Sequence, residues 1–299
     1  MIRFLSDIKN IKFNYNLGKK TWFGSGGNTT FFVEINSESN LQKLVKLLPN
    51  SIPIFVLGAG SNVIIRDGGF NGLTIKLTGA LKKIEFDKEN KTLSIGGATK
   101  DSTISKFCEQ NFISGFEFLR GIPGTLGGNI KMNAGCYGKT ISDNLISCKI
   151  INRKGEITDL CKEEIKFSYR KTSIEKDSII TSANFKINLL NKKKISQNLK
   201  EISKKRISTQ PINCRTGGST FKNPPNESAW KLIDKINYRG KSIGDASVSK
   251  KHANFLINNN LAKSLDLEIL GEEIREKIKK KYNINLDWEL IRIGKFKKI

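Results

Sequence analysis

The chain has 299 residues, of which 37% are hydrophobic, and a formal net charge of +24. This length is enough for two or three domains with a sizeable core, and no apolar run approaches the roughly 18 residues of a membrane span. The one histidine and the five scattered cysteines, none of them in a Cys-x-x-Cys pair, argue against a metal centre and a disulfide framework. Residues 1–7 lack the apolar core and cleavage site of a signal peptide, so we expect a cytoplasmic protein.

The positive charge is spread along the chain rather than gathered in one arm or helix. The tightest lysine runs are only three residues long, at 192–194 and 279–281. An RNA-binding module would need exposed aromatic side chains interleaved with basic ones, whereas Phe116, Phe118 and Phe221 stand in glycine-rich or apolar contexts. The charge therefore does not by itself indicate nucleic acid, although a positive field would steer any polyanionic small molecule.

The first elements expected along the chain form a small α/β unit over residues 1–75. Residues 1–30 are a lead-in with a glycine-rich patch at 23–28, and residues 31–35 and 54–57 are strands. Between these strands, Ser37 or Ser39 caps a helix. The apolar residues of that helix lie mostly on one face: Leu41, Leu44, Val45, Leu47 and Leu48.

An α+β unit is expected next, over residues 76–190. Its signals are β-like runs at 73–77, 92–96, 147–152 and 178–187, and one helix at 101–111. The charged stretch at 191–194 marks the following boundary. Residues 191–299 then contain helices near 195–206, 227–236 and 263–282, and a strand near 290–293.

A Gly-x-Gly-Ser-Asn turn at residues 58–62 lies between two apolar runs that are typical of strands, 54–57 and 63–65. The usual dinucleotide fingerprint, G-x-G-x-x-G, needs a helix that begins at the glycines, and no helix is expected here. A phosphate would therefore be held by backbone N–H groups together with Ser61 and Asn62. The alternative is an ordinary tight β-turn.

A second glycine-rich segment has six glycines in the eighteen residues 121–138. This is too many for a packed helix or strand. Ile122, Pro123 and Leu126 lie between the glycines and imply a buried loop rather than a solvated linker. Two such loops suggest one extended ligand with a pyrophosphate near its middle.

These two segments resemble the flavin-binding loops of the UDP-N-acetylenolpyruvoylglucosamine reductase (MurB) family. Three more segments match in the same order, at 167–173, 217–224 and 286–289, so that the resemblance runs from about Thr21 to Gly294. It implies the shorter subtype, which lacks an extra tyrosine loop. The implied fold is α+β: a two-part FAD-binding region of the PCMH/VAO-like flavin fold, over 1–75 and 76–190, and a smaller α+β domain at 191–299 that binds the UDP-sugar.

The resemblance implies an FAD-containing, NADPH-dependent oxidoreductase of peptidoglycan synthesis. Such an enzyme reduces UDP-N-acetylglucosamine enolpyruvate to UDP-N-acetylmuramate, with FAD bound non-covalently. The expected partners are this substrate and NADPH, with no nucleic acid, membrane or metal, and we expect a monomer. The implied cofactor-binding residues are Gly58, Ala59, Gly60, Ser61, Asn62, Val63, Gly121, Ile122, Pro123, Gly124, Thr125, Gly127, Gly128, Ala134 and Gly135.

Three residues match the family's catalytic positions. Arg170 would polarise the substrate carboxylate, because a guanidinium stays charged and can bind a carboxylate through two N–H groups. Ser219 would donate a proton to the carbanion, a base strong enough for so weak an acid. Glu289 would work with Arg170, although this chain has Trp288 where the family usually has proline. The implied substrate-binding residues are Tyr169, Lys222 and Asn223.

Two alternatives stay open at this point. One is another FAD-linked oxidoreductase of the same flavin fold, many of which tether the flavin through histidine or cysteine. His252 lies outside both loops, and Cys136 is the only cysteine within them. The other is a basic nucleic-acid-binding module, which a colourless protein without affinity for FAD would favour.

Overall fold

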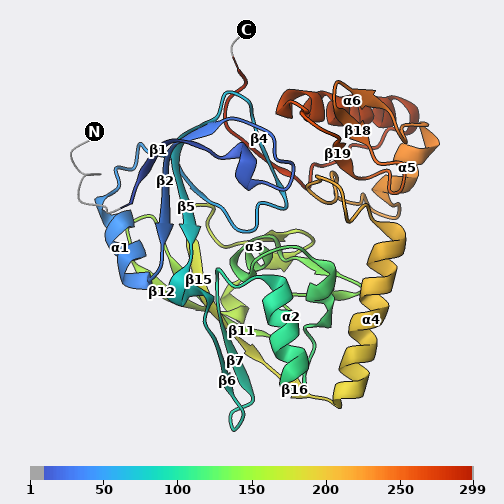
Figure 1. The fold of residues 1–299 in the computed structure, drawn as a ribbon. Helices are drawn as coiled ribbons and strands as arrows, with labels where there is room; N and C mark the ends of the chain where they lie inside the picture. Colours follow the sequence, from blue (N-terminus) through green and yellow to red (C-terminus); the bar gives the residue numbers. More distant parts are fainter. Residues whose placement is uncertain (1–9, 298–299) are drawn as a thin grey trace. The chain divides into compact units, whose positions relative to one another are not determined.

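The computed structural model in Figure 1 describes residues 10–297. Their backbone divides into two compact units, each built from separate stretches of the chain. Unit 1 contains Phe32–Ala59, Gly72–Lys205 and the described residues before Phe13, and unit 2 contains Phe13–Phe31, Gly60–Asn71 and the chain from Arg206 onward. The predicted boundaries at residues 75 and 190 remain a prediction.

The first strands form a four-stranded sheet in the order β1-β2-β5-β3, in which β3 and β5 are parallel. These strands are β1 (Lys12–Asn16), β2 (Asn28–Ile35), β3 (Ile54–Val56) and β5 (Phe70–Leu77). Helix α1 (Glu38–Leu47) begins after Ser37, whose hydroxyl accepts a hydrogen bond from the Asn40 N–H at 3.3 Å, as predicted. Residues 10–30, expected as a plain lead-in, contain β1 and a 3₁₀ turn at Gly18–Lys20.

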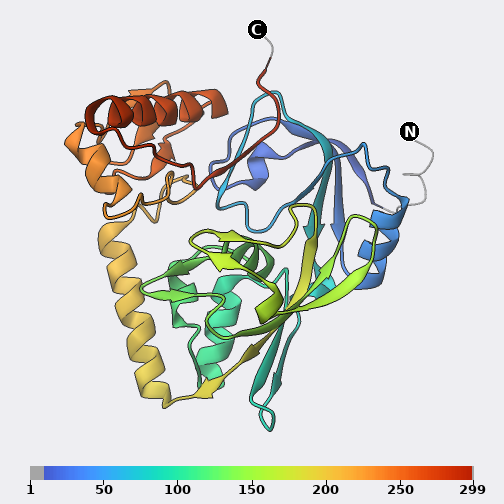
Figure 2. The ribbon, with the colours of Figure 1, turned by 180° about the vertical axis from the view of Figure 1, so that it is seen from behind.

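Unit 1 is centred on a five-stranded antiparallel sheet in the order β12-β11-β15-β7-β6. Its strands are β6 (Ile84–Asp87), β7 (Thr92–Gly96), β11 (Leu145–Ile151), β12 (Ile157–Cys161) and β15 (Ile179–Lys186). The hairpin β6–β7 projects from the sheet in Figures 1 and 2. Helix α2 (Asp101–Gln110) contributes Ile104 and Cys108 to the core over this sheet. The predicted strands and helix of this region are therefore confirmed.

The second glycine-rich segment contains a short helix, α3 (Leu126–Met132), so the expectation that its glycines exclude a helix is wrong. The reason is a close approach of two backbones. The Gly127 N–H donates to the Gly97 carbonyl at 2.8 Å, and a Cβ on Gly127 would lie 3.1 Å from that oxygen. Leu126 and Ile130 are fully buried on the same helix, and this packing outweighs the low helix propensity of glycine.

Short strand pairs complete unit 1. They are β8 (Ile113–Ser114) with β16 (Asn188–Leu189), β9 (Gly135–Cys136) with β10 (Lys139–Thr140), and β13 (Phe167–Ser168) with β14 (Lys171–Thr172). Helix α4 (Lys192–Thr209) then carries the chain into unit 2. The lysines at 192–194, expected as a break, form its first turn.

Unit 2 contains the remaining predicted helices, α5 (Ala229–Lys235) and α6 (Ser264–Tyr282). Helix α6 packs against a small sheet of β17 (Ser242–Ile243), β18 (Ala246–Val248) and β19 (Leu256–Asn258), as Figure 1 shows. The predicted C-terminal strand is β20 (Ile291–Ile293), which pairs in parallel with β4 (Val63–Ile65). The core of unit 2 joins Phe23 and Ile64 to Leu267, Leu270 and Ile274 of α6.

Candidate active site

The turn at residues 58–62 leads into strand β4, so the predicted absence of a helix is confirmed. Gly60 has φ +71°, its carbonyl accepts the Trp22 N–H at 2.8 Å, and a Cβ there would lie 2.5 Å from the Lys20 carbonyl oxygen. The Asn62 side-chain amide donates to the Glu289 carbonyl at 3.1 Å. Hydrogen bonds within the protein thus fix the conformation of the turn. The Asn62 side-chain amide is engaged by Glu289, near the C-terminal end of the sequence.

The two glycine-rich segments meet within unit 1. A Cβ on Gly58 would lie 2.7 Å from the Thr125 hydroxyl oxygen. Thr125 in turn forms a β-bridge with Lys100, just before α2. The suggestion that both loops serve one ligand is therefore compatible with their placement.

Several buried polar atoms of the described residues near these segments have no hydrogen-bond partner in the protein. They are Thr99 Oγ1, Asp101 Oδ2 and Asn133 Oδ1, all in unit 1. Buried polar atoms normally find a partner. Gly128, in the same unit, also has room for a side chain, since an added Cβ would have no heavy atom closer than 3.6 Å. Unpaired polar atoms and a glycine with free space fit a polar, extended cofactor such as FAD.

Asp101 is a buried carboxyl group that the sequence did not single out. It is 1% exposed, and its Oδ1 accepts a hydrogen bond from the Asn129 amide at 2.6 Å. A Cβ on Gly124 would lie 2.6 Å from Asp101 Oδ2 and 2.7 Å from Asn129 Oδ1. Burial raises the pKa of Asp101 to about 7, although hydrogen bonds from Asn129 and the backbone oppose this shift. Asp101 and Asn129 therefore pack directly against Gly124.

Asp101 makes the stability of the protein depend on pH. Since its pKa is raised in the folded state, the folded protein binds the Asp101 proton more tightly than the unfolded chain does. The stability gained in this way is complete below the ordinary pKa near 3.8 and is lost as the pH rises toward and through 7. We expect Asp101→Asn to remove this loss, so that the variant gains stability over the parent protein between pH 4 and 7. Urea unfolding across this range measures the difference. Asp87→Asn, at an exposed carboxyl with a lowered pKa, should leave the slope between pH 5 and 7 unaltered, and equal slopes for Asp101→Asn and the parent would refute the prediction.

The packing also decides which glycine can test cofactor binding. Gly60 and Gly124 lack room for a side chain because of protein atoms alone, so bulky residues there would disturb the fold itself. Gly128 has that room. We expect Gly128→Val to fold normally and to lose bound FAD, as measured by the flavin absorbance of the purified protein and by titration of the apoprotein. Full flavin retention in Gly128→Val would remove this face of α3 from the cofactor site.

Arg170 occupies the turn of the β13–β14 hairpin, in unit 1. It has φ +55°, a left-handed conformation that is uncommon for residues other than glycine. Its guanidinium donates to the Gly135 carbonyl at 2.9 Å and lies 5.0 Å from the Tyr169 ring centroid. Asn133 holds the same hairpin by donating to the Ser168 carbonyl at 3.1 Å. An unfavourable backbone conformation that the surroundings enforce is a feature of functional sites.

Ser219 and Glu289 are brought together in unit 2 by backbone pairing. Phe221 and Trp288 form an antiparallel bridge, and the Glu289 N–H donates to the Thr220 carbonyl at 2.9 Å. Ser219 itself bridges Phe255. The backbone segments that carry Ser219 and Glu289 thus lie side by side, and Asn62 at the end of the 58–62 turn is hydrogen-bonded to Glu289.

The predicted substrate residues beside Ser219 differ in their surroundings. The Lys222 N–H donates to the Asp287 carbonyl at 2.8 Å, which extends the same pairing, and its side chain is half-buried. The Asn223 side chain accepts a hydrogen bond from the Ala229 N–H at 3.0 Å. Asn223 therefore helps to begin α5, in addition to any contact it makes with substrate.

Asn254 is a structural residue of the site that the sequence analysis missed. Its side chain donates to the Phe221 carbonyl at 2.8 Å and accepts the Phe221 N–H at 3.0 Å, and its own carbonyl accepts the Thr220 N–H at 2.8 Å. His252 supports it, because its Nδ1 accepts the Asn254 N–H at 3.3 Å. Burial, followed by the nearby charge of Arg239, lowers the pKa of His252 and keeps it a neutral acceptor. An asparagine within the apolar run Ala253–Leu256 was the available signal.

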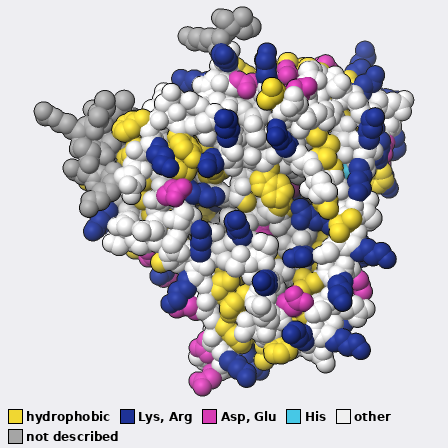
Figure 3. Space-filling model, in the orientation of Figure 1, with side chains coloured by type: hydrophobic (Ala, Val, Ile, Leu, Met, Phe, Trp, Pro, Cys, Tyr) yellow, Lys and Arg dark blue, Asp and Glu magenta, His cyan; other side chains and the backbone are white. Residues whose placement is uncertain are grey.

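The surface gives no sign of a basic patch on the face in view. Figure 3 shows Lys and Arg side chains scattered over that face among Asp and Glu. Within residues 10–297, no helix is both long and apolar enough to span a bilayer. Over the same part of the chain, no three His, Cys, Asp or Glu side chains are grouped so that they could hold a metal ion.

Comparisons with known proteins match both parts of the chain. The family model described as FAD binding domain matches residues 29–160, and the model described as UDP-N-acetylenolpyruvoylglucosamine reductase, C-terminal domain, matches residues 210–293. The fold and the matched domain define an FAD-binding oxidoreductase.

The chain is 45% identical over 282 residues to the UDP-N-acetylenolpyruvoylglucosamine reductase of Rickettsia bellii, covering 94% of this chain and 93% of the relative. It is 42% identical over 285 residues to that of Rickettsia prowazekii, covering 95% and 96%. The crystal structure of UDP-N-acetylenolpyruvylglucosamine reductase from Thermus caldophilus superimposes with a TM-score of 0.82 at 27% identity, covering 95% of this chain and 98% of that one. The chain belongs to the UDP-N-acetylenolpyruvoylglucosamine reductase family, and the predicted family and fold class are confirmed.

Proposed function

We propose that this protein reduces UDP-N-acetylglucosamine enolpyruvate to UDP-N-acetylmuramate with NADPH as reductant. The observation that carries the proposal is the pairing of the Ser219–Phe221 and Trp288–Leu290 segments beside the 58–62 turn, in a chain of this family. When bound, FAD would accept hydride from NADPH and pass it to the enolpyruvyl group. The protein contributes binding, charge and a proton.

We assign cofactor binding to the two glycine-rich segments. In the first, backbone N–H groups of Gly58–Val63 and the Ser61 hydroxyl would face the phosphates. In the second, the residues from Gly121 to Gly128 and Ala134–Gly135 would approach the cofactor closely. The free space at Gly128 and the unpaired atoms Thr99 Oγ1, Asp101 Oδ2 and Asn133 Oδ1 support this assignment.

We assign the chemistry to Arg170, Ser219 and Glu289. Arg170 would bind the substrate carboxylate and stabilise the negative charge that develops beside it. Ser219 would supply the proton that ends the reaction, and Lys222 would favour the transient alkoxide. Because a carboxylate would repel an enolate, Glu289 would orient Arg170 or a water molecule and would not contact the enolate directly. Tyr169 and Asn223 would contact the UDP-sugar.

We further propose that the enzyme acts as a monomer in the cytoplasm, on small molecules rather than on nucleic acid or membranes. Support comes from the nature of the substrate, a UDP-sugar used in precursor synthesis, and from the scattered charge in Figure 3. Gel filtration with light scattering tests the monomer, and a mass near 33.5 kDa is expected.

The absorbance spectrum of the purified protein tests the function directly. We expect the purified protein to be yellow. In the absence of oxygen, NADPH should bleach the flavin, and only the UDP-enolpyruvyl sugar should restore its absorbance. Flavin that stays with acid-precipitated protein would indicate a covalently tethered oxidoreductase instead. A colourless protein that does not take up FAD would contradict the proposal altogether.

A further inference from the structure

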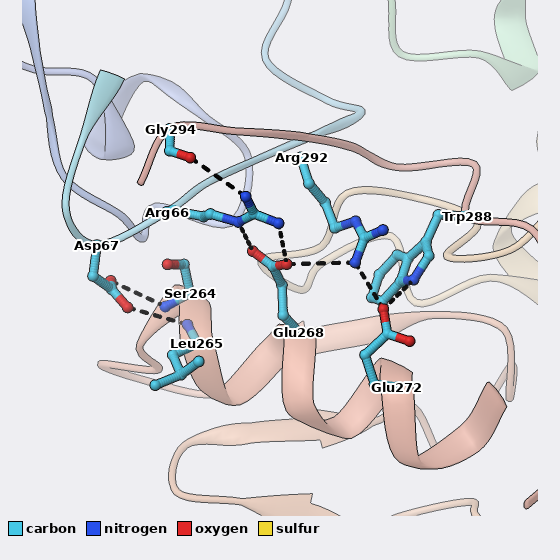
Figure 4. A network of polar contacts seen from close by, with 9 residues as sticks. All are labelled: Arg66, Asp67, Ser264, Leu265, Glu268, Glu272, Trp288, Arg292 and Gly294. Atoms are coloured by element: carbon cyan, nitrogen blue, oxygen red, sulfur yellow. Dashed lines mark hydrogen bonds and ion pairs between the residues drawn. The ribbon is translucent and has the colours of Figure 1, made fainter. Parts of the chain in front are cut away.

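A network of polar contacts joins helix α6 to the paired strands β4 and β20 (Figure 4). We call Arg66, Glu268, Glu272, Trp288 and Arg292 the α6 network. Glu268 and Glu272 are four residues apart on α6, so their side chains share one face of the helix. All five residues belong to unit 2.

The Glu268 carboxylate binds an arginine next to β4 and an arginine in β20. Glu268 is 4% exposed, and it accepts hydrogen bonds from Arg66 Nε at 2.8 Å and Arg66 Nη2 at 3.0 Å, and from Arg292 Nη1 at 3.4 Å. Arg66 follows β4 directly, and Arg292 lies within β20. A buried carboxylate with two arginine partners has its charge compensated, so the register of β4 against β20 is anchored to α6.

Glu272 fixes the indole of Trp288. Its Oε1 accepts hydrogen bonds from Trp288 Nε1 at 2.9 Å and from Arg292 Nη1 at 2.8 Å. Burial alone would raise the pKa of Glu272, but hydrogen bonds from Arg275, Trp288 and Arg292 outweigh it and lower the pKa. The carboxylate therefore stays charged and remains an acceptor at neutral pH.

The indole is held on its other sides as well. The Arg292 guanidinium lies 4.3 Å from the ring centroid, and the Phe221 ring lies 5.0 Å away. Gly271 makes room for the ring, because a Cβ there would lie 2.2 Å from an indole carbon. These contacts therefore hold the Trp288 indole in one position, packed against Gly271 of α6.

Glu289 follows Trp288, and both of its backbone polar groups are engaged by the Thr220 carbonyl and the Asn62 amide. Successive side chains of an extended segment point to opposite sides. With the indole held on the α6 side, this alternation predicts that the Glu289 side chain points to the opposite side.

We infer that Trp288 and Glu272 are positioning residues for Glu289. The contacts of Trp288 with α6 hold the backbone before Glu289 in one conformation. This inference rests on the proposed role of Glu289 in the reaction. A displacement of about 1 Å in a reacting group can slow a reaction about 10²-fold. Loosening the indole should therefore slow the half-reaction that uses Glu289 and spare the other.

The test compares Trp288→Phe and Glu272→Ala with the parent holoenzyme by stopped-flow absorbance. Trp288→Phe keeps an aromatic ring beside Phe221 and removes the Nε1 donor together with part of the indole packing against Gly271. We expect flavin reduction by NADPH to be unchanged, and reoxidation by the UDP-enolpyruvyl sugar to slow about 10- to 100-fold. The double variant should be no slower than the slower single variant, because the hydrogen bond between Glu272 and Trp288 is already lost in each single variant. Independent, multiplying effects would overturn the inference, as would equal slowing of both half-reactions.

Fluorescence provides a readout apart from turnover. In a Trp22→Phe/Trp230→Phe background, Trp288 is the one remaining tryptophan of the sequence. Glu272→Ala should lower its steady-state anisotropy, whereas Glu276→Ala, at the exposed position one turn further along α6, should change neither anisotropy nor reoxidation. Unchanged anisotropy in Glu272→Ala would contradict the inference.

Glu289 variants separate this inference from the proposed function. If Glu289→Ala slows reoxidation while Trp288→Phe and Glu272→Ala do not, the proposed role of Glu289 stands and its positioning by α6 is wrong. If Glu289→Ala reacts like the parent, Glu289 has no role in the reaction and the inference is overturned with it. If Glu289→Gln keeps part of the activity that Glu289→Ala loses, orientation is supported for Glu289 itself.

Discussion

Ser219→Ala is expected to leave flavin reduction by NADPH intact and to slow flavin reoxidation by the UDP-enolpyruvyl sugar by roughly 10²–10⁴-fold. The loss is confined to one half-reaction because the hydroxyl would deliver its proton only after hydride has reached the substrate. The backbone around Ser219 does not depend on that hydroxyl, since Asn254 and the Thr220–Glu289 pairing hold the segment. Single-turnover stopped-flow absorbance, with each half-reaction run separately, gives both rates.

Two further variants sharpen the Ser219 experiment. Ser219→Cys retains an acidic proton and should recover part of the lost rate. Ser242→Ala, at an exposed serine on β17, should behave like the parent in both half-reactions. Equal slowing of reduction and reoxidation in Ser219→Ala would assign the serine to structure, and normal reoxidation would exclude it from proton delivery.

Arg170→Gly is expected to slow turnover strongly with little change in the stability of the protein. Glycine adopts a φ of +55° without the steric cost of about 1–2 kcal/mol that a side chain carries in this conformation. This gain offsets the lost hydrogen bond to Gly135, which contributes about 0.5–1.5 kcal/mol. Because glycine also costs about 0.5–1 kcal/mol in backbone entropy, the free energy of unfolding should change by only about 1 kcal/mol, whereas reoxidation should slow roughly 10²–10³-fold through loss of charge stabilisation.

The control for Arg170 is a residue with the same backbone conformation and no proposed role. Lys91 has φ +50° in the hairpin between β6 and β7, so Lys91→Gly should relieve similar strain and leave both half-reactions unchanged. Urea unfolding measures stability for both variants. If Arg170→Gly were clearly less stable than the parent and still turned over, the arginine would be retained for its contact with Gly135 and not for the substrate.

Local sequence patterns predicted helices α1, α2, α4, α5 and α6 and the strands β7, β11 and β15 of the central sheet, whereas β6, β12 and the short strand pairs were missed. The Ser37 cap, the long strands of the central sheet and the 58–62 turn between two strands were all predicted, because each depends on residues that are close together in the chain. The segments that carry Arg170, Ser219 and Glu289 were also found from their residue patterns. Their roles remain proposals, since a pattern shows which residues are present and not how they act.

By itself, then, the sequence determined the family, the order of elements and the candidate residues. Only the tertiary structure decided the features that depend on distant parts of the chain. Helix α3 forms across two glycines because Gly127 packs against Gly97, and Asp101 has a raised pKa because the fold buries it, although the hydrogen bond from Asn129 opposes this shift. Arg66 and Glu268 are 202 residues apart in the sequence, yet their ion pair anchors β4 to α6. Neither composition nor periodicity records such contacts, because burial and register are set by packing between segments that local propensity does not connect.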